Sequence, residues 1–132
     1  MGIDYGNRRI GIALSESGVL ATPHSVISNG GNLDQAAEKI AAIARDVGAD
    51  LIVVGVPERD RGEVPAKFER FAGLLRDRTN RPVEMWNEAY TTTEALSRRH
   101  SRGGGRRTRQ PIDHEAAAIM LQSYIDEKEP GP

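Results

Sequence analysis

Three acidic residues occupy positions where a carboxylate needs an explanation: Asp4, Glu88 and Asp113. Asp4 lies inside the apolar opening "MGIDYGNRRIGIAL", Glu88 breaks the apolar pattern at the end of "PVEMWNE", and Asp113 lies in the first turn of the last predicted helix. A buried charge is costly unless it is paired or holds a metal. If these three carboxylates meet, they supply the oxygen ligands that Mg²⁺ and Mn²⁺ prefer.

Each of these acids also has a simpler explanation. Asp113 is favourable in the first turn of any helix, because negative charge stabilises a helix N-terminus. Glu88 is as well explained by pairing with a surface arginine. Asp4 is the most informative of the three, because it lies in a strand and not in a turn. An aspartate that faces the edge of a sheet is also common, so the position of Asp4 alone leaves open whether it holds a metal.

The elements that must position these acids follow from apolar spacing. Alternation and apolar runs predict strands over residues 1–5, 9–15, 19–27, 49–57 and 81–88. Helical spacing predicts helices from the Asn32 cap to 47, over 64–78, from the Thr91–Thr93 cap to 100, and over 112–127.

The order of these elements predicts an α/β protein with a mixed five-stranded sheet and flanking helices. Ile10, Ile12 and Leu14 alternate on one face of the second strand, and "GNR" before it indicates a hairpin turn. Pro23 places the third strand near an edge, and the apolar run over 49–57 is typical of a strand buried on both faces. Pairing is expected to be antiparallel first and parallel afterwards, so that strand ends carrying the acids share one edge.

Composition indicates an ordinary globular chain. The 132 residues are 38% hydrophobic and 28% charged, which predicts one domain over residues 1–127 with a C-terminal tail over 128–132. No apolar run approaches the roughly 20 residues that a membrane span needs, and no signal peptide is visible. The absence of cysteine excludes disulfides and thiolate metal sites and favours a cytoplasmic protein.

The net charge of −1 conceals a local concentration of arginine. The segment "RRHSRGGGRRTR" carries six arginines and no acid: Arg98, Arg99, Arg102, Arg106, Arg107 and Arg109. It lacks the phosphate-loop pattern, so it is either a solvated loop or an arm that grips a nucleic-acid backbone. Arg8 and Arg9 in the first hairpin are candidates for the same contact. The three histidines, His24, His100 and His114, have no metal-ligand spacing and are expected at the surface.

Four stretches in order give this chain a family resemblance. "GIDYGNRRIGIALSE", "TP" at residues 22–23, "IVVGVP" at 52–57 and "IDHEAAAIMLQSYID" at 112–126 resemble the YqgF family, also called RuvX, over nearly the whole chain. The resemblance implies a ribonuclease-H-like fold and a metal-dependent nuclease that processes the 5′ end of pre-16S ribosomal RNA, or that cuts Holliday junctions or single-stranded nucleic acid. Matched by position, the family's acidic triad falls on Asp4, Glu88 and Asp113.

This resemblance leads to a mechanistic expectation. The three acids would hold two Mg²⁺ or Mn²⁺ ions, which activate a water and stabilise the leaving oxygen. Asp4 is the expected bridging ligand, because the first strand lies centrally in this fold. Arg8, Arg9 and the arginine arm would neutralise the flanking phosphates of the nucleic acid with little sequence reading. Composition is compatible with a monomer or a homodimer.

The chain departs from the family where the motif D-E-R is replaced by "NEA": Asn87 and Ala89 flank Glu88. This change favours the main alternative, a nucleic-acid-binding or ribosome-assembly module with weakened or no catalysis. A second alternative follows from the opening hairpin, which also resembles that of actin-like ATPases and sugar kinases. Those proteins enclose ATP between two such domains, and 132 residues provide one.

Overall fold

The computed structural model describes residues 1–56, 65–87 and 113–128. The described strands are β1 (Gly2–Tyr5), β2 (Arg9–Leu14), β3 (Thr22–Ser28), β4 (Ile52–Val56) and β5 (Val83–Asn87). The described helices are α1 (Leu33–Val47), α2 (Ala66–Thr79) and α4 (Asp113–Lys128). None of these helices is long and apolar enough to cross a membrane.

The strands form one mixed sheet in the order β3-β2-β1-β4-β5. β1 pairs antiparallel with β2, and β2 pairs antiparallel with β3. β1 and β4 are parallel, as are β4 and β5. This confirms the predicted mixed sheet, the central position of the first strand and the edge position of the strand that contains Pro23.

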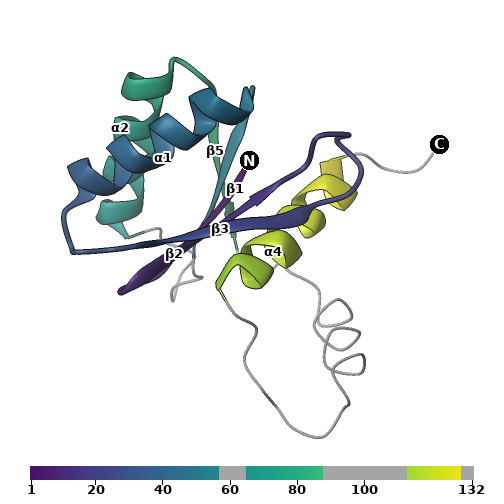
Figure 1. Ribbon diagram of the computed structural model, residues 1–132, viewed down its shortest axis with the longest axis horizontal. Coiled ribbons are helices and arrows are strands. Elements are labelled where there is room, and N and C mark those ends of the chain that lie inside the picture. The colour runs from purple at the N-terminus through teal and green to yellow at the C-terminus, as the bar shows by residue number, and fades with distance from the viewer. Residues whose placement is uncertain (57–64, 88–112, 129–132) are drawn as a thin grey trace, which may run out of the picture.

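Helices cover both faces of the sheet (Figure 1). α1 and α2 lie on one face, where Ile10 and Ile12 of β2 join the larger core with Phe71 and Leu75 of α2. The hydrophobic effect drives this burial, because both faces of the sheet and one side of each helix are apolar. The predicted Asn32 cap is confirmed, since its side chain accepts a hydrogen bond from the Gln35 backbone N–H at 3.0 Å.

α4 covers the opposite face, where it contacts β1, β2 and β3. Gly2 makes this close packing possible, because a Cβ built there would lie 2.9 Å from the Leu121 Cβ. The buried residues of α4 include Ala117 and Leu121, whereas Ala116 and Ile119 are only half-buried. The buried surface of α4 is wide, because a helix that crosses three strands is buried over a wider arc than one apolar stripe.

The third strand begins three residues later than predicted. It begins at Thr22, whereas Val19 and Leu20 are 69% and 63% exposed. The backbone turns before it, because the Ser17 hydroxyl accepts hydrogen bonds from the N–H groups of Val19 and Leu20 and Gly18 has a φ of +78°. The predicted helix ending at residue 100 lies outside the described residues.

Candidate active site

The carboxyl ends of β1, β4 and β5 meet at one edge of the sheet, because the three strands are parallel neighbours. In the register of the sheet Asp4 is level with Gly55, and Gly55 is level with Trp86. Strand alternation places Asp4 on the same face as Gly2, which lies against α4. Asp4 is half-buried there, and Gly55, with no side chain, separates it from β5.

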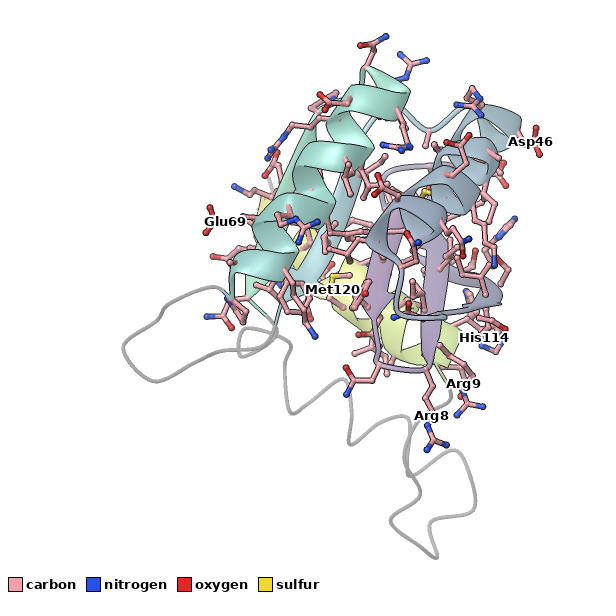
Figure 2. The ribbon with its side chains drawn as sticks, turned by 90° about the vertical axis from the view of Figure 1, so that its left-hand side faces the viewer. Arg8, Arg9, Asp46, Glu69, His114 and Met120 are labelled. Atoms are coloured by element: carbon pink, nitrogen blue, oxygen red, sulfur yellow. The ribbon has the colours of Figure 1, made fainter. Side chains whose placement is uncertain are left out.

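α4 runs so that its N-terminal end lies at this same edge. Leu121 packs against Gly2 at the beginning of β1, and Asp113 begins the helix eight residues earlier. At 1.5 Å per residue, eight residues move the chain about 12 Å along the helix axis. Figure 2 shows His114 at the same end of the molecule as Arg8 and Arg9 of the β1–β2 hairpin. The first turn of α4 is therefore at the edge that carries Asp4.

The three predicted acids differ in how much of each the structure describes. Asp4 is described in full, and Asp113 is placed as the first residue of α4, with its side chain outside the description. Glu88 lies outside the described residues; it follows Asn87, the last residue of β5. The meeting of the three carboxylates therefore stays a prediction. Among the described residues, no three His, Cys, Asp or Glu side chains gather closely enough to hold a metal.

Arg8 and Arg9 lie at the end of the first hairpin, and both are exposed. Their side chains extend from the sheet into solvent in Figure 2. The hairpin is closed by a 3.0 Å hydrogen bond from the Gly6 N–H to the Arg9 carbonyl. Two cationic side chains thus follow Asp4 within five residues at the same edge. The six arginines between residues 98 and 109 lie outside the described residues.

His114 differs from its prediction as a surface residue. Its ring is half-buried, and its Nδ1 is buried with no hydrogen-bond partner among the described residues. The reason is its position at the beginning of a helix that packs across the sheet. His24 is exposed, as predicted, and His100 lies outside the described residues.

Sequence reasoning did not find a polar contact on the α4 face of β5. The Glu84 carboxylate accepts a hydrogen bond from the Tyr124 hydroxyl, and burial of that hydroxyl together with Glu84 raises the pKa of Tyr124 to about 12. Trp86 packs edge-on against the Tyr124 ring with 5.4 Å between ring centroids. This cluster connects the end of β5 to α4 and so connects the strand before Glu88 to the helix that begins at Asp113. Local spacing could not reveal it, because residues 84 and 124 belong to separate elements.

Comparison with known proteins agrees with this geometry. Residues 1–127 match the RuvX family, described as Holliday junction resolvase. The chain belongs to the RuvX family. It is 40% identical over 134 residues to a Pelotomaculum thermopropionicum protein named "Putative pre-16S rRNA nuclease", and the match covers 96% of this chain and 85% of the relative. The resemblance expected from the sequence is therefore confirmed, and the chain is a resolvase-like nuclease.

Solved structures confirm the ribonuclease-H-like fold of this RuvX chain. The Thermus thermophilus RuvC bound to a Holliday junction has a TM-score of 0.62 at 15% identity, over 96% of this chain and 92% of RuvC. A Thermus thermophilus hexokinase of the ROK type has a TM-score of 0.52 at 24% identity, over 75% of this chain. The match spans only 37% of the hexokinase, so most of that enzyme lies outside the shared core.

Proposed function

We propose that this RuvX chain hydrolyses phosphodiester bonds with divalent metal ions held by Asp4, Glu88 and Asp113. The proposal rests on one observation: β1, the end of β5 and the beginning of α4 lie at the same edge of the sheet. The parallel strands bring Asp4 of β1 and the end of β5, which precedes Glu88, to one edge. α4 begins there at Asp113. Three elements far apart in the sequence thus converge on one place.

The donor set suits a hard cation. Carboxylates from a central strand, a strand end and a helix N-terminus offer only oxygen ligands, and Mg²⁺ and Mn²⁺ need few protein ligands when phosphate and water complete the shell. When bound, such ions lower the pKa of a water and stabilise the charge on the leaving oxygen.

The residues of this chain hold Asp4 in place and provide positive charge for the phosphates of the nucleic acid. β1 holds Asp4 rigidly, because it pairs with a strand on each side. Gly55 adds no side chain beside Asp4 and leaves that place to substrate and ligands. Arg8 and Arg9 contact flanking phosphates as cations, which adds salt-dependent affinity and little sequence preference.

We propose pre-16S ribosomal RNA as the substrate, because the relatives are named for that activity, and we propose cleavage at its 5′ end, as the family resemblance implies. Cleavage of a junction, as the RuvC complex suggests, is the second candidate, and it would need two sites related by a two-fold axis. A cytoplasmic location suits either substrate. The arginine arm, from Arg98 to Arg109, is proposed to contact the same nucleic acid.

Asp4→Asn tests the proposal. The wild-type chain, Asp4→Asn and Asp50→Asn are incubated with end-labelled RNA bearing the 16S 5′ extension, single-stranded DNA and a four-way junction. Each is tested with Mn²⁺, Mg²⁺ or EDTA. Asp50 is a matched control, because it is an exposed acid just before β4 at the opposite edge. We expect metal-dependent cleavage that Asp50→Asn retains and Asp4→Asn loses.

Two results would contradict this proposal. Cleavage by Asp4→Asn at the wild-type rate would remove Asp4 from the site. Binding without cleavage by the wild-type chain under both metals would favour the binding-module alternative, in which the replacement of D-E-R by "NEA" has removed catalysis.

A further inference from the structure

The β1–β2 hairpin has a two-residue turn without the usual backbone of such turns. Asn7 and Arg8 connect Gly6 to Arg9, and neither has a positive φ, since Asn80 is the non-glycine residue with one in the described part of the chain. Two-residue hairpin loops favour types I′ and II′, which need a positive φ, because their twist matches that of the strands. The backbone preference that fixes type I′ and II′ turns is therefore absent from this turn, and contacts with other segments matter more for its shape.

Asn29 provides that contact. It follows β3, and its backbone N–H donates to the Arg8 carbonyl at 2.7 Å, which extends the β2–β3 pairing by one residue into the turn. Its side-chain Nδ2 donates to the Gly6 carbonyl at 2.7 Å. Asn29 thus binds both sides of the turn that carries Arg8 and Arg9.

The orientation of the Asn29 amide is defined by its two neighbours. Its Oδ1 accepts from the Gly31 N–H at 3.0 Å, while Nδ2 faces the Gly6 carbonyl. A flipped amide would place an oxygen against a carbonyl and an NH₂ against an N–H. The donor at Nδ2 is therefore what the hairpin needs from this side chain.

We propose that Asn29 is a positioning residue for nucleic-acid binding. Its side-chain amide holds the Gly6–Arg9 turn so that Arg8 and Arg9 present their charges to the nucleic acid beside Asp4. The inference rests on the proposed function, in which these two arginines contact phosphate. Asn29 itself acts through the hairpin.

Asn32 gives a matched control for the test. It lies three residues later in the same connection and uses its side-chain oxygen as an acceptor to cap α1. Aspartate is as good an N-cap as asparagine, so Asn32→Asp retains its bond. Asn29→Asp retains the acceptor toward Gly31 but loses the donor toward Gly6. Both variants change the net charge by the same amount.

The experiment measures the Kd of the full-length chain for an end-labelled single-stranded RNA in EDTA over a range of salt concentrations. We expect the Kd of Asn29→Asp for the RNA to be about fivefold higher than that of Asn32→Asp. A factor of about five in an equilibrium constant corresponds to the net contribution of one hydrogen bond. In a background of Arg8→Ala and Arg9→Ala the two variants should bind equally. Asn29→Ala replaces Asn29→Asp if the latter does not fold, because it removes the donor without placing a carboxylate against the carbonyl.

Three outcomes are distinguishable. Equal binding by Asn29→Asp and Asn32→Asp in the wild-type background would overturn the positioning role and leave the proposed function intact. A fivefold difference that persists without Arg8 and Arg9 would assign Asn29 a general structural role and overturn it as well. Failure of the wild-type chain to bind RNA would overturn the proposed function, and the positioning role with it.

Discussion

The packing of α4 on Gly2 predicts that one added methyl group weakens the fold and the site together. A Cβ at position 2 would lie 2.9 Å from the Leu121 Cβ, whereas carbon atoms pack best at about 3.5–4.0 Å. Both atoms are bonded directly to the backbone, so no rotamer change relieves the contact. β1 and α4 must therefore separate by up to about 1 Å.

Overpacking of this kind costs about 1–3 kcal/mol. With a urea dependence of about 2 kcal/mol per M, Gly2→Ala should lower the unfolding midpoint by about 1 M. Because α4 begins at Asp113, the same displacement should lower cleavage, and a 1 Å misplacement can cost about 100-fold. Urea titration followed by circular dichroism measures stability, and the RNA cleavage assay measures the site.

Gly73→Ala is the matched control for this prediction. Gly73 lies within α2, and a Cβ there would meet nothing within 4 Å. The same substitution should therefore stabilise the chain by about 0.5–1 kcal/mol, because alanine favours the helix and restricts the unfolded state. A Gly2→Ala variant as stable as the wild type would refute the close packing of α4 on β1. A comparable loss in both variants would refute the assignment of the effect to Leu121.

Two further predictions concern charge. The raised pKa of Tyr124, about 12, means that the unfolded chain releases this proton first, so stability should fall as pH rises from about 10 to 12. Tyr124→Phe should flatten this part of the stability–pH curve measured by urea titration, and an unchanged slope would remove Tyr124 as its cause. Arg8→Ala should weaken RNA binding and reduce the slope of log K against log salt by about one, whereas an unchanged slope would show that Arg8 contacts no phosphate.

The site depends on how the second half of α4 is held against the rest of the fold. Leu121 packs on Gly2, and the Gln122 side chain bonds the connection before β3, with 2.8 Å from the Ala21 N–H to its Oε1 and 2.8 Å from its Nε2 to the Val19 carbonyl. These contacts lie away from Asp113, in the second half of the helix. The position of the first turn is therefore set by packing at a distance from the proposed chemistry.

The sequence by itself determined most of the elements, because their signals are local. Alternation of Ile10, Ile12 and Leu14 defined β2, the Asn32 cap began α1, and the uninterrupted apolar run produced the fully buried β4. Asp4 was conspicuous for the same reason, since a carboxylate interrupts a short apolar strand. The motifs around it were sufficient to indicate the family.

Only the tertiary structure decided which of these residues come together. The wide burial of α4, the late beginning of β3 and the contacts of Asn29 and Tyr124 depend on strand order and register. Asn29 reaches Gly6 across 23 residues of sequence, and no local pattern encodes that distance. A hydrogen bond between separate elements exists only once hydrophobic packing has fixed their relative positions, so these contacts appear in the folded chain and not in its sequence pattern.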